Sequence, residues 1–588
     1  MSDDVETRQA GTIEERRVWP WTFRSRLAEP GSFVRVVELV TTRGLLTEPN
    51  AARVVSTALQ LTELGIADAL SITDNAGGHP KIAPESLGSM LLEHAQDVII
   101  HLTCKDLNRN GLESRAWTLA DAGFENILCL SGDHPVDGYM GQPGAVFDVD
   151  SIGLLHMLDD MNHGMRVIKP RRGEPDRLPA TNLFLGATVS PFKLQERELI
   201  PQYLKLDAKI ANGAKFIITQ VGYDSRKLDE LLKYIELSAI GRQPSAVRNQ
   251  HVGAGGRAGP SGRADTAVRP YKSDGGEGSS YPPSPIPHPP AVIANVCVLT
   301  GFLARHFNRG AVPGVVVSDE LLAVAERQAT SPDKGKAFFH ELAAKQIAIA
   351  RGLGYRGAYL SGHLEPAEVK AIFDKADSFG PDDWREMARE IRFQQPGEFY
   401  FFEQDPESGL SSKEINRGYV ASLSPKGRAI LRSRVPATYR FSRFLHDHLF
   451  DPVSRGFRAG RWFYSGVESR PGVKRWLHAG EQATKIGMFD CRDCGDCSLP
   501  DIAYLCPESQ CAKNQRNGPC GGSHQGFCEV GEKECIWARA YDRLKPYGEE
   551  QRMLDRPPVF KEGSLKGSSA WGNTFLGRDH HAGKRKVE

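Results

Sequence analysis

The sequence contains no run of about eighteen apolar residues, which is the length that a membrane-spanning helix requires. It also lacks an excess of either charge, because 74 Lys and Arg residues nearly balance 73 Asp and Glu residues. That balance argues against a nucleic acid or a charged membrane surface as a partner. The first 20 residues are polar and lack the apolar segment of a secretory signal. We therefore predict a soluble cytoplasmic protein whose thiols stay reduced.

Cysteine, by contrast, is concentrated near the C-terminal end. Eight of the eleven cysteines lie between residues 491 and 535. They are Cys491, Cys494, Cys497, Cys506, Cys511, Cys520, Cys528 and Cys535. Disulfides are disfavoured in a reducing compartment. Four thiolates can instead bind one zinc ion or one cubane iron–sulfur cluster, so eight cysteines provide for two ions or two clusters.

The spacing of these cysteines favours iron–sulfur clusters, with zinc as the alternative. The CxxCxxC opening at 491–497 places three thiolates in one tight loop. A zinc knuckle usually takes fewer ligands from one run, whereas three suit one face of a cubane. Cys506-Pro507 and the glycine-rich sequence NGPCGGS around Cys520 suit a backbone that wraps closely around an inorganic core.

A repeating pattern dominates residues 31–375. Eight short apolar runs alternate there with helix-like segments such as 50–64 and 336–352. The eight runs are 33–39, 69–73, 98–103, 127–130, 183–186, 216–220, 292–296 and 357–360. Repeated strand–helix units favour a parallel sheet. Eight such units over about 340 residues predict an α/β fold of the (β/α)8 TIM-barrel type, with insertions.

Polar residues end five of the predicted strands. In such barrels the chemistry lies at the carboxyl ends of the strands. The residues at those ends are Glu38, Thr73, Asp74, His101, Thr103, Asp133 and Gln220. Any one of them alone would be read as an ordinary loop residue. Their concentration at one predicted rim marks the candidate active site.

The other segments lack this alternation. They are a polar N-terminal arm (1–30), a disordered insertion (241–289), a helical connecting region (376–485), a cysteine-rich metal or cluster domain (486–550) and a disordered tail (551–588). The insertion is rich in Gly, Pro, Ser and Arg and cannot bury enough apolar surface to offset its ordering entropy. The connecting region mixes Arg with aromatics, which we interpret as packing against the barrel rather than as a nucleic-acid face.

Three motifs inside the predicted barrel carry a family resemblance. HLTC at 101–104, SGDHP at 131–135 and GAKFIITQ at 213–220 resemble, in order and spacing, the motifs of methylenetetrahydrofolate reductases. The resemblance covers residues 30–375 apart from the insertion. CGDCSLP at 494–500 and NGPCGGS at 517–523 resemble the C-terminal domain that is fused to, or partnered with, some bacterial members.

The resemblance implies a flavin barrel, with FAD or alternatively FMN, that converts methylenetetrahydrofolate into methyltetrahydrofolate. It implies Glu38 as the catalytic general acid, which needs a raised pKa. Asp133 would be the second catalytic residue, close to both flavin and folate, and Gln220 would contact the pterin. The flavin-contacting positions would be Thr73, His101, Gly132, Asp133 and Lys209.

The sequence also departs from the family pattern. Ser131 replaces the arginine of RGD, residues 189–193 replace a Tyr-Pro-x-x-His segment, and residues 359–363 replace a late tyrosine motif. These changes fall where the family grips its dinucleotide or its NAD(P)H donor. A ferredoxin-like donor acting through the cysteine-rich domain is the alternative electron route. We also expect a homo-oligomer.

Two other interpretations remain open. The cysteine-rich domain would be a zinc-stapled docking module for a methyltransferase partner, or the barrel would be a folate-binding methyltransferase without redox chemistry. The direction of the reaction is left open by the sequence.

Overall fold

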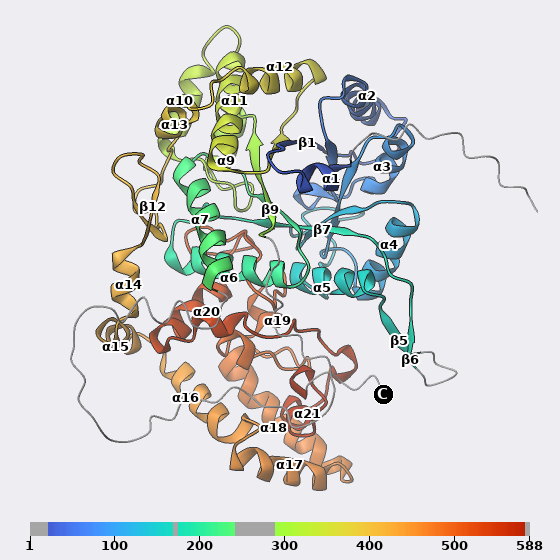
Figure 1. Cartoon of the computed structure of the whole chain (residues 1–588). Coiled ribbons are helices and arrows are strands. Elements are labelled where there is room, and N and C mark those ends of the chain that lie inside the picture. The colour runs from blue at the N-terminus through green and yellow to red at the C-terminus, as the bar shows by residue number, and fades with distance from the viewer. Residues whose placement is uncertain (1–21, 169–174, 242–288, 583–588) are drawn as a thin grey trace, which may run out of the picture.

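The structure is a computed structural model that describes residues 22–168, 175–241 and 289–582 (Figure 1). Apart from its two end residues, the predicted insertion at 241–289 lies outside these ranges, as does most of the predicted N-terminal arm. No helix of the described residues is long and apolar enough to cross a membrane.

Eight parallel strands close into a barrel, which confirms the predicted fold. Around the barrel they follow the order β1-β10-β9-β8-β7-β4-β3-β2. Their bounds are β1 (Val34–Leu39), β2 (Ala69–Ile72), β3 (Val98–Thr103), β4 (Asn126–Leu130), β7 (Phe184–Val189), β8 (Phe216–Thr219), β9 (Ala291–Cys297) and β10 (Gly357–Ser361). Each of the eight predicted runs overlaps one strand. A small antiparallel hairpin, β5 (Arg166–Ile168) with β6 (Pro175–Arg177), stands outside the barrel.

Helices cover the outside of the barrel. They are α2 (Pro49–Leu64), α3 (Pro84–Glu93), α4 (Arg109–Asp121), α5 (Ser151–Asn162), α6 (Glu196–Ala211), α7 (Ser225–Gly241), α9 (Gly301–Asn308), α10 (Asp319–Gln328), α11 (Lys336–Leu353) and α12 (Pro366–Asp377). The local sequence determines where several of these helices begin. Asp150 accepts hydrogen bonds from two backbone amides of α5, and a proline occupies the first turn of α2. Helices α2 and α11 match the predicted segments 50–64 and 336–352.

The described part of the predicted N-terminal arm contains one short helix. Helix α1 (Phe23–Ala28) buries Phe23 completely at the amino end of the barrel. The Phe23 ring lies 5.3 Å from that of Phe216 and 6.2 Å from that of Phe184, both edge-on. An apolar side chain is needed here because the barrel interior would otherwise open to water at this end.

The connecting region is mainly helical. Its elements are α13 (Trp384–Glu390), β11 (Phe402–Gln404), β12 (Ser411–Ile415), α14 (Arg417–Leu423), α15 (Pro425–Ser433), α16 (Ala437–Leu445), a π-helical turn η2 (His446–Phe450), α17 (Arg455–Val467) and α18 (Pro471–Phe489). The β11–β12 hairpin was not part of the helical prediction. Buried Glu230 of α7 accepts hydrogen bonds from the backbone amides of Phe401 and Phe402 and so ties the hairpin to the barrel.

The cysteine-rich segment has little regular structure beyond α19 (Pro507–Gln510) and α20 (Ile536–Leu544). The prediction of a disordered tail is wrong for residues up to 582, which form α21 (Ala570–Phe575) and short 3-10 turns. The reason is aromatic packing: the buried Phe575 ring stacks on Tyr464 at 5.4 Å and on Phe450 at 5.2 Å.

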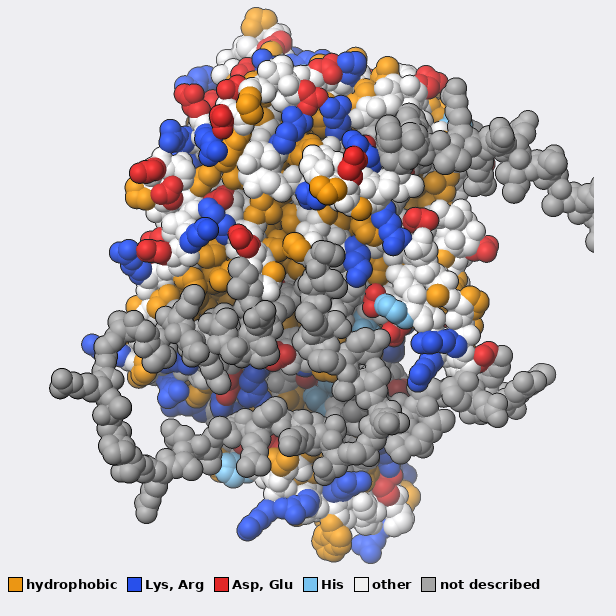
Figure 2. Space-filling view, in the orientation of Figure 1, with side chains coloured by type: hydrophobic (Ala, Val, Ile, Leu, Met, Phe, Trp, Pro, Cys, Tyr) orange, Lys and Arg blue, Asp and Glu red, His pale blue; other side chains and the backbone are white. Residues whose placement is uncertain are grey.

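The segments from α16 onward lie against one side of the barrel, next to α5 and α6 (Figure 1). Helix α20 packs on α6. Charged side chains of both signs are interspersed over the barrel face in Figure 2, in keeping with the net charge of +1.

Candidate functional site

The barrel interior changes from apolar to polar along its strands. Val34, Val36, Ala69, Ile99 and Tyr359 belong to the cluster that fills the amino end and the middle. Because side chains alternate along a strand, the next inward positions are two residues further on. These positions are Glu38, Ser71, His101 and Ser361. The polar layer therefore lies at the carboxyl end, where the sequence predicts the site.

Glu38 is part of a hydrogen-bonded chain across this layer. The hydroxyl of Tyr359 donates to Oε2 of Glu38 at 2.8 Å and lies 3.4 Å from Nε2 of His101. The same His101 nitrogen lies 2.9 Å from Oγ of Ser71. Burial raises the pKa of Glu38 above its usual value, against the Tyr359 hydrogen bond, which lowers it. Burial lowers the pKa of His101 to about 4, so its ring is neutral at neutral pH.

A second polar group follows strands β2, β3 and β4. Asp74 accepts hydrogen bonds from the amide and hydroxyl of Thr103, at 3.2 and 2.8 Å, and from Nη1 of Arg115 at 3.1 Å. Oδ2 of Asp133 accepts from the amide of Gly77 at 2.9 Å. Thr73 is buried, and its hydroxyl has no hydrogen-bond partner. An orphaned hydroxyl at the mouth is available to a ligand.

The remaining predicted residues lie elsewhere around the rim. Nε2 of Gln220 donates to the carbonyl of Pro313 at 3.2 Å. Lys209 lies on α6, where its amino group donates to the carbonyl of Thr188 on β7. Burial lowers the pKa of Lys209 to about 7. Lys209 is therefore not part of the Glu38–His101 chain but faces the layer between barrel and cysteine-rich segment.

The cysteine-rich segment is attached to loops at the barrel mouth. Nζ of Lys513 donates to the carbonyl of Gly132 at 2.7 Å, and the hydroxyl of Ser131 donates to Oε1 of Gln515 at 3.0 Å. On the other side, Nζ of Lys193 donates to the carbonyl of Gly521 at 2.6 Å. The loop that carries Cys520 is thus held against the ends of β4 and β7.

Buried lysines surround Cys520. Lys193, Lys205 and Lys209 each donate to neutral oxygens, and burial lowers the pKa of all three. A thiolate at Cys520 would counteract that effect at each of them. Lysines in this position would stabilise an anionic, thiolate-bound centre, because buried positive charge requires a nearby negative one.

The eight cysteines fall into two sets of four. Electrostatic coupling links Cys491, Cys494, Cys497 and Cys506 in one set, and Cys511, Cys520, Cys528 and Cys535 in the other. Burial raises the pKa of Cys497 and of Cys511 to about 12. A bound cation is what would turn such thiols into thiolates. We call these the first and the second cysteine set.

Sequence reasoning missed several residues of this region. Tyr359 and Ser71 link Glu38 to His101, yet in the sequence Tyr359 stands out only as a departure from the family pattern, and Ser71 does not stand out at all. Both residues occupy positions whose side chains point into the barrel, because side chains alternate along a strand. This alternation is the feature of the sequence that could have identified them. Lys513 and Gln515 carried no such signal, because their role depends on a contact with residues more than 380 positions away.

Two separate parts of the chain match known protein families. Residues 45–243 match the family described as methylenetetrahydrofolate reductase, and residues 470–561 match the family described as methylene-tetrahydrofolate reductase C terminal. No curated protein matches the chain.

Two solved structures are similar in part. One is an uncharacterized protein from Clostridium thermocellum that binds two copies of 5-methyl-5,6,7,8-tetrahydrofolic acid, at 12% identity and a TM-score of 0.37, covering 60% of this chain and 96% of that one. The other is the EDTA monooxygenase EmoA from Chelativorans sp. BNC1, at 10% identity and a TM-score of 0.32, covering 62% and 95%. Both likenesses are too weak to indicate a function.

Proposed function

Since the chain belongs to the methylenetetrahydrofolate reductase family and carries that family's C-terminal domain, we propose that it is a flavin-dependent enzyme interconverting 5,10-methylenetetrahydrofolate and 5-methyltetrahydrofolate. The observation that supports this most directly is the buried carboxyl of Glu38, hydrogen-bonded to Tyr359 at the barrel mouth.

Glu38 fits the role of the proton donor. Its raised pKa keeps a proton on the carboxyl to higher pH than usual, as a general acid requires. In the direction of reduction that proton goes to N10 of the folate, the bond between N10 and the methylene carbon breaks, and an N5 iminium remains. A hydride then adds to the iminium carbon and leaves a methyl group. Gln220, which directly follows β8, would hold the pterin in this proposal.

A bound flavin would supply the hydride. The mouth has features that suit one: the unpartnered hydroxyl of Thr73, the neutral ring of His101, and Asp133 with the backbone of Gly132. Gly132 has a positive φ of 83°, and a side chain there would lie 3.0 Å from Thr103 and Lys105. These residues would bind and orient the cofactor, and α1 closes the opposite end of the barrel against water.

The second cysteine set supports an electron route into the barrel. Its Cys520 loop is hydrogen-bonded to Lys193, and neighbouring Gln515 and Lys513 bond to Ser131 and Gly132 beside Asp133. The second set is therefore the proximal centre in this proposal. The first set is the distal one, since its contacts run to α18 and to the tail, through Lys485 and Asn573.

The order of the cysteines along the chain favours clusters over zinc in this proposal. The CxxCxxC run at 491–497 offers three thiolates from one loop, which suits one face of a cubane.

The test uses anaerobically purified full-length protein. We expect about eight iron and one flavin per chain, as four iron per cubane requires. Single-turnover oxidation of the reduced flavin by 5,10-methylenetetrahydrofolate should fall at least about 100-fold in Glu38→Gln, the usual contribution of a general acid. The exposed Glu63→Gln is the matched control and should match wild type. Protein without flavin, or equal rates in both variants, would contradict the proposal.

The metal content of the purified protein also indicates which electron donor to test. With iron present, we expect a reduced ferredoxin-like protein to reduce the flavin faster than NAD(P)H does. About two zinc ions with one flavin would instead support a structural, zinc-stapled docking domain and NAD(P)H as donor.

A further inference from the structure

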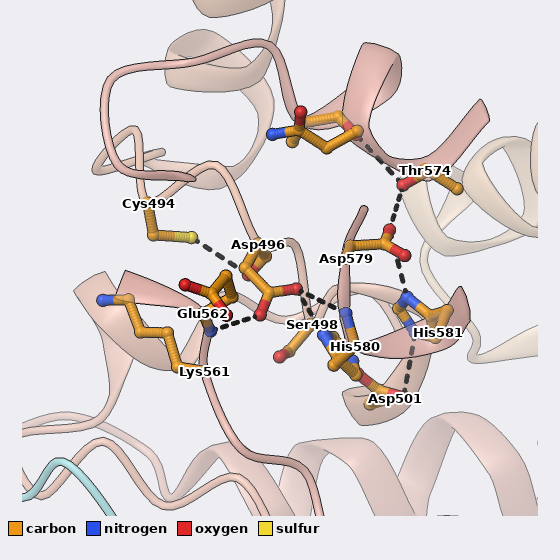
Figure 3. Close-up of polar contacts among 12 residues, drawn as sticks. Cys494, Asp496, Ser498, Asp501, Lys561, Glu562, Thr574, Asp579, His580 and His581 are labelled. Carbon is orange, nitrogen blue, oxygen red and sulfur yellow. Dashed lines mark hydrogen bonds and ion pairs between the residues drawn. The ribbon is translucent and has the colours of Figure 1, made fainter. Parts of the chain in front are cut away.

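A group of two histidines and three aspartates lies away from the barrel, where the folded tail meets the cysteine-rich segment (Figure 3). Asp501 belongs to the 3-10 turn η3 (Pro500–Ile502), and His580 and His581 belong to η7 (His580–Ala582). Oδ2 of Asp501 lies 2.8 Å from Nε2 of His580, and Oδ1 lies 3.2 Å from Nε2 of His581. Taking one ligand atom from each of the three residues, all three atoms lie within 4.8 Å of one another.

The second nitrogen of each ring is anchored by another carboxylate. Nδ1 of His580 lies 2.5 Å from Oδ1 of Asp496, which is fully buried and also accepts from the amide of Glu562 at 2.8 Å. Nδ1 of His581 lies 3.5 Å from Oδ2 of Asp579, another buried residue. Both rings therefore present Nε2 to the same carboxylate. Metal-binding histidines are typically held in this way, with the far ring nitrogen on a carboxylate.

We propose that Asp501, His580 and His581 bind one divalent transition-metal ion of the zinc class, with water completing its coordination. Zinc with Zn–N and Zn–O near 2.0–2.1 Å holds tetrahedral ligand atoms about 3.3 Å apart, so the observed distances of 2.8 and 3.2 Å need only small adjustments. Two imidazoles and one carboxylate suit zinc or a similar ion, whereas magnesium and calcium prefer oxygen ligands alone.

The surrounding charges are compatible with such an ion. Three carboxylates face the two rings: Asp496 lies 2.5 Å and Asp501 2.8 Å from nitrogens of His580, and Asp579 lies 3.5 Å from Nδ1 of His581. The negative charge gathered here is what a divalent cation would offset. Nε of Arg556 also lies 3.8 Å from Oδ1 of Asp501.

The ion would fasten the tail to the first cysteine set. Asp496 lies between Cys494 and Cys497, and Asp501 follows Cys497 by four residues. His580 and His581 come from the end of the folded tail. A metal bridging these segments would fix the CxxCxxC loop without using any of its thiols.

The experiment compares metal content in full-length, anaerobically purified proteins that are incubated with Zn²⁺ and then freed of unbound metal. We expect wild type to hold one zinc more per chain than His581→Asn and than Asp501→Asn, at equal iron and flavin content. His581 is one-third exposed, so its replacement should not disturb folding. The matched control is His448→Asn, an exposed histidine of the connecting region whose Nδ1 lies 2.8 Å from the Phe444 carbonyl and whose ring packs on that of Phe444. This variant should keep the extra zinc.

Two outcomes would overturn the inference. One is equal zinc content in wild type and His581→Asn. The other is that Co²⁺, used in place of zinc, shows the intense thiolate charge-transfer absorption of a cysteine site, because the extra ion would then be bound by the cysteine sets. Neither outcome depends on enzyme activity, so the result is separate from that of the proposed reaction.

Discussion

Replacing Tyr359 with phenylalanine should make the proton of Glu38 harder to remove. The hydroxyl of Tyr359 donates to Glu38 at 2.8 Å and lowers the pKa of that carboxyl, against the larger effect of burial, which raises it. Phenylalanine keeps the ring and its packing but removes the donor. The carboxylate form then loses a hydrogen bond, and the protonated form is favoured over a wider pH range.

The size of the effect follows from the kind of bond that is lost. A hydrogen bond to a charged group contributes about 1.5–3 kcal/mol, and one pH unit corresponds to about 1.4 kcal/mol. The rate of a step that needs protonated Glu38 falls at alkaline pH. In Tyr359→Phe we expect this alkaline limb to move upward by roughly one to two pH units.

The assay is single-turnover oxidation of the reduced flavin by 5,10-methylenetetrahydrofolate across a pH series, which does not depend on the electron donor. Tyr355→Phe is the matched control, because Tyr355 is also buried but donates to the carbonyl of Leu228 at 2.9 Å, away from the mouth. Its profile should match wild type. A limb that stays in place in Tyr359→Phe, or moves to lower pH, would refute the role of Glu38 as the proton donor.

Three further predictions concern stability. Phe23→Ala should lower the free energy of unfolding by about 3–5 kcal/mol, because it empties a fully buried site at the amino end of the barrel; denaturant unfolding checks this, with the exposed Phe302→Ala as control. Folded His101 has a pKa of about 4, below its ordinary 6.5, so the unfolded chain binds the extra proton between these values. Stability should therefore be lost as pH falls from about 6.5 to 4, by up to about 3 kcal/mol, and His101→Gln should lack this part of the loss. Glu481→Ala should leave Lys485 buried without its partner at 3.1 Å and remove the acceptor of Ser569 at 2.6 Å. We expect a cost of about 3–5 kcal/mol and faster proteolysis of the tail, whereas the exposed Glu414→Ala should behave as wild type.

The barrel was predictable because its signal is local. Each strand is a short apolar run, and the residues at its carboxyl end share one edge by the rules of parallel topology. Glu38 and His101 could therefore be assigned to one rim from the sequence alone. The chain that joins them could not, because Tyr359 lies 321 residues from Glu38 and becomes its neighbour only when β10 closes the barrel beside β1.

The tail shows where composition misleads. Residues 551–588 are polar on average, a composition that predicts disorder. The tail is ordered because a few of its side chains contact residues that are distant in the sequence. Phe575 stacks on Tyr464, and the side-chain amide of Asn573 donates to the carbonyl of Gly495 at 2.9 Å. The paired histidines at 580–581 went unnoticed for the same reason, since their carboxylate partners Asp496 and Asp501 lie about 80 residues earlier.

The structure also gives a physical reason for two departures from the family pattern. Ser131 stands where the family has arginine, and its hydroxyl contacts Gln515 of the cysteine-rich segment at 3.0 Å. The site is buried, so an arginine there would need the space that Gln515 fills. Lys193, within the replaced 189–193 segment, holds the carbonyl of Gly521. Both departures thus lie where the cysteine-rich segment is hydrogen-bonded to the barrel. Glu38, His101 and Asp133, by contrast, are the residues that the family motifs have at these positions. At these two positions the changes therefore serve docking of the cysteine-rich segment, whereas the third departure, at 359–363, places Tyr359 within hydrogen-bond distance of Glu38 in the polar layer itself.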